Sequence, residues 1–300
     1  ARRHTWLQGI FASILTTVLL VQPAGGSYLV RLRHTLHTPE SRDLAFAWLK
    51  ANQEPWEDIA VSGRLWLPPF SFTTEGVPRL VLKGADRVDP QENLVDLYLR
   101  GYSRIVLGPE RIFTPEERAL LSQIKKFKGG KRSERIVKNP EITVYRFAEG
   151  TALKEAVSKR VETLARMALI TAGESAGISM SGKEDYVWLD RRVGRIAFTN
   201  VSEVNKCADR GGNIRLVFEL MTPWPGQKLV FSLPAWSFSW QVQDGDLGKW
   251  VKVSVVMPYE RLRSVGDLGF EVSHVHSPFT QGLSSDTRRL GVAVRGVRCG

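Results

Sequence analysis

The chain has 300 residues, of which 43% are hydrophobic and 24% are charged, so it can bury the cores of two ordinary domains, and disorder is excluded as its main state. Its formal net charge of +11 comes from lysines and arginines that are spread along the sequence rather than gathered in one arm or stripe. Nucleic-acid binding is therefore not expected, whereas a basic surface near anionic lipid fits the composition.

The first predicted element is an apolar run at residues 6–21, WLQGIFASILTTVLLV, which follows Arg2 and Arg3. A membrane helix needs about 20 apolar residues, and the following QPAGGSYLV completes that length before Arg31. A signal peptide has the same charged start and apolar middle, although no clear small-residue cleavage site follows, and a buried helix is the third alternative. We expect a transmembrane helix with its flank at residues 1–35, which places the rest of the chain on the extracytoplasmic side of the inner (plasma) membrane.

Residues 36–150 are predicted to form a small α/β domain. Three helices are expected where a capping oxygen precedes a proline, at Thr38-Pro39, Asp89-Pro90 and Thr114-Pro115. The third of them is expected to continue to Phe127, before two glycines. Short apolar runs between the helices predict strands, and these runs are DIAVSG, RLVLKG, SRIVLG and EITVYRF. Helices that alternate with strands are typical of an α/β layer structure.

Residues 151–184 are predicted to be a connecting helix and a linker, since an apolar stripe is followed by the small, polar stretch TAGESAGISMSGKED. From residue 185 the hydrophobic period changes to two. Alternating strands are expected at NIRLVFEL, PAWSFSWQV and WVKVSVVM, separated by turns rich in glycine and proline. The pattern predicts an antiparallel β-sandwich of the jelly-roll type over residues 185–300.

The sequence offers few residues for chemistry. AGESAG resembles the nucleophile elbow of hydrolases only weakly, and no phosphate-binding glycine loop is present. His274 and His276 fall on one face of a predicted strand, where they could share a metal, but no third ligand follows, so a solvated strand face is the preferred interpretation. We therefore assign no catalytic residue, no metal ligand and no cofactor.

Two of the nine tryptophans are candidates for stacking on sugar rings. Trp224 lies in a turn between prolines, and Trp250 alternates with Lys252 on the face opposite inward-pointing valines, so both are expected to be exposed. The alternative, which we prefer at this level, is that both simply fill space. Trp236 and Trp240 are expected in the core.

Two cysteines, Cys207 and Cys299, fall near the first and last strands of the predicted sandwich. They would form a disulfide in an oxidising compartment, and two unpaired core cysteines fit equally well, whereas a zinc site does not. Asp286 and Arg288 precede the final alternating strand, where the aspartate can accept backbone N–H groups of its own turn and the arginine can pair with a neighbouring loop. We interpret them as a structural turn that ties loops together rather than as a ligand site.

The order of these segments resembles a known family. Three segments resemble the C-terminal extracytoplasmic region of bacterial GT-C class membrane glycosyltransferases, the dolichyl-phosphate-mannose mannosyltransferase and ArnT-like group. They are TPESRDLAFAWLKANQEPWEDIAVSG, LYLRGYSRIVLG and EITVYRF. SDTRRLGVAVRGV resembles the closing strand of β-sandwich modules appended to cell-envelope glycosyltransferases. Each motif has modest specificity, and their order carries the resemblance.

The resemblance implies a parent enzyme that transfers a sugar from a polyprenyl-phosphate donor to a cell-envelope acceptor. In such enzymes the catalytic acidic residue, an Asp or Glu that acts as a base, lies in the first extracytoplasmic loop between early membrane helices, so this chain by itself is expected to be non-catalytic. Its expected partners are the lipid bilayer, the polyprenyl-phosphate sugar and an envelope glycan, with no nucleic acid. A secreted, non-enzymatic carbohydrate-binding or adhesion protein is the alternative.

Overall fold

The structure is a computed structural model. It describes residues 41–63, 65, 70–72, 78–80, 82–128, 141–164, 167–169, 186–198, 207–209 and 211–300. The apolar run at residues 6–21, which we expect to be a membrane helix, lies outside these residues. Within the described ranges, no helix has both the length and the apolar composition that crossing a bilayer requires.

The first unit is built on a five-stranded sheet in the order β4-β1-β5-β7-β6. Its strands are β1 (Ile59–Ser62), β4 (Ala85–Val88), β5 (Arg104–Leu107), β6 (Leu121–Phe127) and β7 (Ile142–Phe147). The first three strands in space run parallel, whereas β7 and β6 are antiparallel to their neighbours. A separate two-stranded hairpin pairs β2 (Phe70–Phe72) with β3 (Pro78–Leu80).

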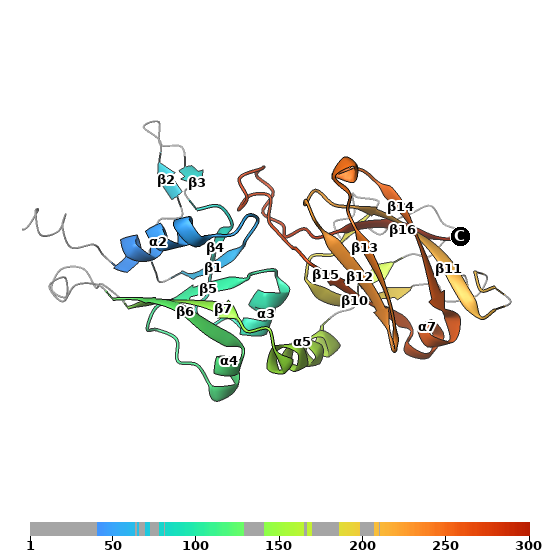
Figure 1. Ribbon diagram of the computed structural model, residues 1–300, viewed down its shortest axis with the longest axis horizontal. Coiled ribbons are helices and arrows are strands. Elements are labelled where there is room, and N and C mark those ends of the chain that lie inside the picture. The colour runs from blue at the N-terminus through green and yellow to red at the C-terminus, as the bar shows by residue number, and fades with distance from the viewer. Residues whose placement is uncertain are drawn as a thin grey trace, which may run out of the picture.

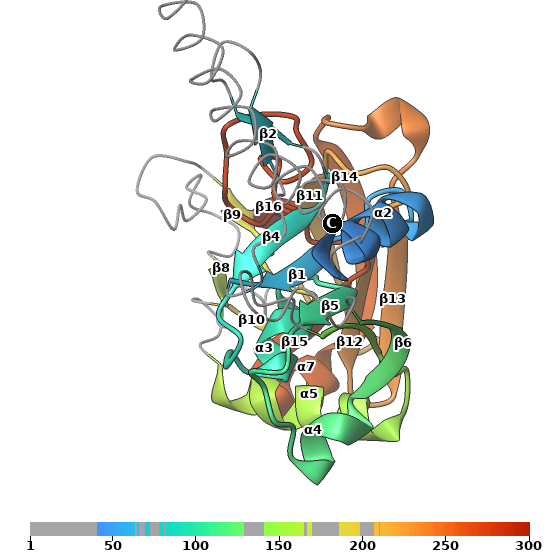
Figure 2. The ribbon, with the colours of Figure 1, turned by 90° about the vertical axis from the view of Figure 1, so that its left-hand side faces the viewer.

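Helices cover both faces of this sheet (Figure 2). Successive residues of a strand point to opposite faces, so β1 sends Ile59 towards α2 (Ser41–Asn52) and Ala60 towards the other side. That other face packs against α3 (Leu94–Leu99) and α5 (Thr151–Thr163). α5, expected as a connecting helix, is therefore part of the core of the first unit.

Two of the expected helices differ from the structure. Thr114 and Glu117 do form a capping box at the start of α4 (Pro115–Ala119), but the predicted extension to Phe127 is wrong, because the chain turns into the edge strand β6. Hydrogen bonds to β7 outweigh the helical spacing of its apolar residues. Likewise, Asp89 begins only a turn, and α3 starts later, after the N-cap Asn93.

The second unit is a sandwich of two sheets (Figure 1). The five-stranded sheet has the order β13-β12-β15-β10-β8, and the four-stranded sheet has the order β14-β11-β16-β9. Its strands are β8 (Met167–Leu169), β9 (Val187–Trp188), β10 (Val193–Phe198), β11 (Asn213–Met221), β12 (Lys228–Leu233), β13 (Trp236–Gln241), β14 (Val251–Pro258), β15 (Asp267–Val272) and β16 (Ala293–Cys299). A short helix, α7 (Tyr259–Val265), connects β14 to β15.

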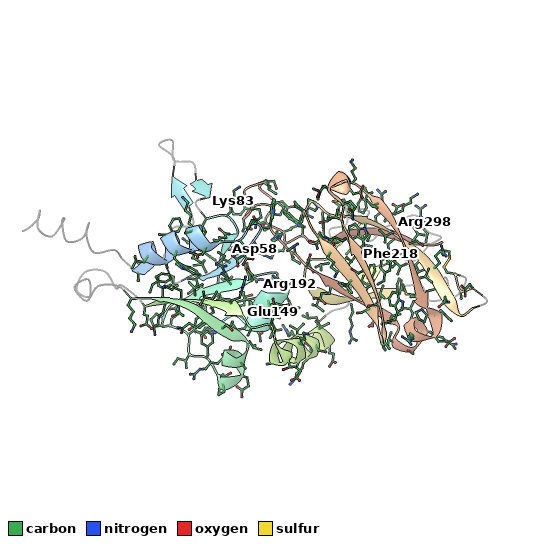
Figure 3. The ribbon with its side chains drawn as sticks, viewed as in Figure 1. Asp58, Lys83, Glu149, Arg192, Phe218 and Arg298 are labelled. Atoms are coloured by element: carbon green, nitrogen blue, oxygen red, sulfur yellow. A yellow bond between two sulfur atoms is a disulfide. The ribbon has the colours of Figure 1, made fainter. Side chains whose placement is uncertain are left out.

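The period-two pattern is confirmed in this unit, since alternate residues of each long strand enter one buried cluster between the sheets. Phe218 of β11 and Phe231 of β12 stack across it with ring centroids 4.7 Å apart, and Figure 3 shows Phe218 within the sandwich. If β9 to β16 are numbered one to eight, the strand order of the four-stranded sheet is 6-3-8-1. The strand order of the other sheet is 5-4-7-2, and β8 adds a fifth strand at its edge.

Loops of the sandwich join the two units through the backbone. The N–H group of Arg192 donates to the carbonyl of Leu99 at 2.7 Å, and that of Gly84 donates to the carbonyl of Thr280, also at 2.7 Å. Figure 1 shows the loop between β15 and β16 reaching back towards β4, at the amino ends of the parallel strands. The two units therefore meet at a hydrogen-bonded junction.

Candidate functional site

Trp224 is not the exposed platform that its turn predicts. Its side chain is 1% exposed, and its indole Nε1 donates to the carbonyl of Leu290 at 2.5 Å. His276 packs edge-on against it, with ring centroids 5.0 Å apart. Trp56 also packs against Trp224, with ring centroids 5.9 Å apart, and it is 38% exposed. The expectation of an exposed Trp224 is wrong, because the turn folds back onto the segment before β16.

Asp286 and Arg288 form a local turn. The backbone N–H of Arg288 donates to Asp286 Oδ1 at 2.9 Å, and its Nη2 donates to Oδ2 at 2.9 Å. These bonds hold the pKa of the Asp286 carboxyl below its usual range. The residue that reaches a distant loop is instead the next one, Arg289, to which the sequence analysis gives no role.

The guanidinium of Arg289 donates a hydrogen bond to a buried carboxylate of the first unit, that of Asp58. Asp58 lies directly before β1, and its side chain is fully buried. It accepts hydrogen bonds from Arg289 Nη2 and, at 2.8 Å, from Gln281 Nε2, while His276 Nδ1 lies 3.1 Å from its Oδ2. We call Asp58, His276, Gln281 and Arg289 the Asp58 cluster. It joins one residue of the α/β unit to three residues of one sandwich loop, and Figure 3 shows Asp58 at this junction.

An aromatic ring supports the cluster from the first unit. The guanidinium of Arg289 lies 4.2 Å from the ring centre of Tyr102, whose hydroxyl donates to Asp86 at 2.7 Å. Burial raises the pKa of the Tyr102 hydroxyl. Arg289 also donates to the carbonyls of Arg100 and Val275, so its guanidinium is satisfied on several sides.

This cluster is built for structure rather than for catalysis. His276 is 3% exposed, and its Nε2 is buried without a hydrogen-bond partner in the part of the chain that the structure describes. The solvated strand face expected for His276 is therefore wrong. His274 stacks on it at 5.4 Å, and burial, together with His276 and Arg192, lowers the pKa of His274 to about 4. Among the described residues no three His, Cys, Asp or Glu side chains are grouped to hold a metal.

Cys207 and Cys299 are joined by a disulfide, with their Cα atoms 5.1 Å apart. Cys299 ends β16, and Cys207 lies beside Ala208, which bridges to Ile214 at the start of β11. The bond therefore ties the last strand of the sandwich to the segment that enters its central strand.

Trp250 lies where its alternation predicts, on the outer face of the four-stranded sheet. Val251, the next residue, pairs with Leu220 of β11, and the buried residues of β14 are Val253, Val255 and Met257. Register places Trp250, Met221, Ala293 and Trp188 in one line across the four strands, from β14 to β9. Since neighbouring strands are about 4.8 Å apart, this line spans about 14 Å.

A third aromatic residue connects the two tryptophans. Tyr186 packs edge-on against Trp250 at 5.4 Å and against Trp188 at 5.8 Å. All three side chains are partly exposed. We call Tyr186, Trp188 and Trp250 the aromatic row. Sequence reasoning missed Tyr186 and Trp188, although their spacing of two residues within YVW was a signal that both point to one face.

Charged side chains lie beside the aromatic row in the next line across the sheet. Glu219 of β11 stands opposite Lys252 of β14 and Arg295 of β16. Arg295 Nη2 lies 2.9 Å from the Glu219 carboxylate, and the Arg295 guanidinium lies 4.6 Å from the ring centre of Trp250. The guanidinium thus fixes the ring of Trp250 and offers hydrogen-bond donors next to it.

A groove of about 1040 Å³ lies elsewhere, between α5 and the outer face of the five-stranded sheet. Glu271, Lys154 and Ser232 line it. Of its two aromatic lining residues, Tyr98 is engaged with Phe147 and with Arg192, and Phe270 is buried in the core of the sandwich. The aromatic row gathers three partly exposed aromatic side chains in one place, so we take it as the better candidate site.

Comparison with known proteins gives no relative, since no protein-family model, no curated protein and no solved structure matches this chain.

Proposed function

We propose that the described part of the chain is a non-catalytic carbohydrate-binding unit that acts outside the cytoplasm and holds a glycan on the aromatic row. The observation that carries the proposal is the arrangement of Tyr186, Trp188 and Trp250, which lie together on the outer face of one sandwich sheet. Two tryptophans at opposite edges of a sheet, linked by a tyrosine, offer an extended line of contact.

The chemistry of a sugar ring suits this surface. One face of the ring carries C–H groups that pack on an aromatic side chain, and its edge carries hydroxyl groups. Beside the aromatic row, Arg295 supplies N–H donors and Glu219 supplies carboxylate acceptors. These charged groups are held in place by their own ion pair, so their side chains would lose little further entropy when a glycan binds.

The strand order supports assigning the sandwich to the jelly-roll type, with two facing sheets and crossover connections. Jelly rolls occur in many lectin domains. The fold alone does not specify a function, and the argument therefore depends on the site.

The disulfide between Cys207 and Cys299 favours an oxidising compartment. The sequence resemblance extends the proposal to a parent protein, a membrane glycosyltransferase that takes its sugar from a polyprenyl-phosphate donor. In that parent, the unit described here would hold the acceptor glycan near the membrane surface, and the catalytic base, an Asp or Glu, would lie in another part of the polypeptide.

The test is binding to an array of bacterial envelope glycans. Trp250→Ala and Trp188→Ala are each expected to weaken binding about tenfold, the effect of about 1.4 kcal/mol of lost contact. Trp56→Ala is the matched control, because Trp56 is an exposed tryptophan whose ring contacts are Trp224 and His276 rather than the aromatic row. Equal affinity of the wild type and both row variants would refute the proposed site.

A further inference from the structure

We infer that the glycan held on the aromatic row is acidic, carrying carboxylate or phosphate groups. The inference rests on the proposed function and goes on to name the class of ligand. It depends on the charges that share the outer face of the four-stranded sheet with the aromatic row.

Four basic side chains point outwards on this face, and one carboxylate opposes them. They alternate with the buried residues of their strands, and they are Arg215 on β11, Lys252 on β14, and Arg295 and Arg298 on β16. Glu219 is the only acidic residue on the outward positions of these three strands. Figure 3 shows Arg298 at the outer side of the sandwich.

One carboxylate does not neutralise four cations. Glu219 pairs closely with Arg295, and Arg298 Nη2 lies 3.8 Å from its other oxygen. Arg215 and Lys252 form no ion pair with any described residue, and both are exposed. The face therefore retains an excess of positive charge, which attracts an anionic ligand and repels a cationic one.

Along the strands, the unpaired basic side chains Lys252 and Arg215 both lie to one side of the aromatic row. From Trp250, β14 runs through Lys252 and then past Val256, which pairs with Arg215. The acidic residues Asp244 and Asp246 come earlier in the chain, before Trp250 and β14, and are not among the residues of this face. An acidic glycan would therefore stack a ring on the aromatic row and direct its anionic groups towards the arginines.

An anionic membrane surface is the competing partner, and the structure favours the glycan. Binding to a bilayer interface needs apolar side chains that enter the headgroup region. The aromatic rings of this face are partly buried against one another, and Val256 is the large apolar side chain on it that stands exposed, at 44%. The surface suits lateral stacking better than insertion.

The experiment compares acidic envelope polysaccharides with chemically neutralised forms of the same chains, namely carboxyl-reduced uronic-acid polymers and dephosphorylated teichoic acids. The protein is expected to bind the acidic forms at least fivefold more tightly, and the preference should shrink as salt rises from 50 to 500 mM, roughly the range over which exposed charges become screened.

The double variant Arg215→Gln/Lys252→Gln should lose about fivefold to tenfold in affinity for the acidic forms and leave neutral binding unchanged. The matched control is Lys159→Gln/Lys228→Gln, which removes the same charge from exposed lysines on α5 and β12. Equal binding of acidic and neutral forms would overturn the inference while keeping the proposed function. Glycan binding weakened about tenfold in Trp250→Ala, with an acidic preference in the wild type, supports both.

Two other outcomes would count against the account. Binding to phosphatidylglycerol vesicles with none to any polysaccharide would overturn the inference in favour of a membrane surface. Binding to neutral polysaccharides that Trp250→Ala leaves intact would overturn the proposed function itself.

Discussion

Replacing Asp58 with alanine removes the carboxylate on which the junction of the two units converges. The side chain of Asp58 is fully buried, and Arg289 is 11% exposed on its side chain. Removal of one partner leaves a buried guanidinium without its main counter-charge, since the nearest other carboxylate, Asp86, is 3.9 Å from Arg289 Nη1. The substitution also leaves Gln281 Nε2 and His276 Nδ1 without their acceptor.

The expected cost follows from burial. Breaking a buried ion pair on one side typically lowers the free energy of unfolding by about 3–5 kcal/mol, a large part of the total of a folded domain. With a urea dependence of about 2 kcal/mol per molar, the midpoint of unfolding should fall by about 2 M. Arg288→Ala, which breaks an exposed local pair, should cost less than about 1 kcal/mol.

Urea unfolding followed by tryptophan fluorescence measures both variants, and Trp56 and Trp224 report on the junction because they pack beside His276. In Asp58→Ala, the junction should unfold at a lower urea concentration than the sandwich, so that two unfolding transitions are seen. Equal stabilities of Asp58→Ala and Arg288→Ala would refute the reasoning that the Asp58 cluster holds the two units together.

Three further predictions concern stability. Cys207→Ser/Cys299→Ser should lose about 2–5 kcal/mol of unfolding free energy, measured by urea titration, and a variant as stable as wild type would contradict a structural bond. The lowered pKa of His274, about 4, means that the unfolded state takes up its proton first, so stability should fall as pH drops from about 6.5 to 4, and His274→Gln should flatten this slope; an unchanged slope would contradict the assignment. Gly101 has φ +99°, and a Cβ there would lie 2.3 Å from a carbonyl oxygen, so Gly101→Ala should be destabilised by about 1–3 kcal/mol, more than Gly226→Ala, and thermal unfolding that ranks the two equally would contradict this close approach.

Local patterns predicted the strands of this protein better than its helices. The period of two placed β11, β13 and β14 correctly, because each has one inward face, which is buried in β11 and β14 and partly buried in β13. The run after Thr114 has helical spacing, yet it becomes a strand, because β7 offers hydrogen bonds along its edge. Pairing partners far along the chain decide such segments.

The site shows the same limit. Alternation with Lys252 correctly put Trp250 on an outer face, since that is a local property of one strand. Trp224 was misplaced because its burial depends on the carbonyl of Leu290, which is distant in sequence. The role of Arg289 was equally hidden, since its partner Asp58 belongs to the other unit.

Hydroxyl-radical footprinting of the full chain, with and without the polysaccharide that binds most tightly, tests the central claim most directly. The account predicts that the glycan protects Trp250, Trp188 and Tyr186 from oxidation and leaves Trp56 unchanged. Protection of residues in the groove between α5 and the five-stranded sheet, with Trp250 oxidised as fast as in the free protein, would contradict it.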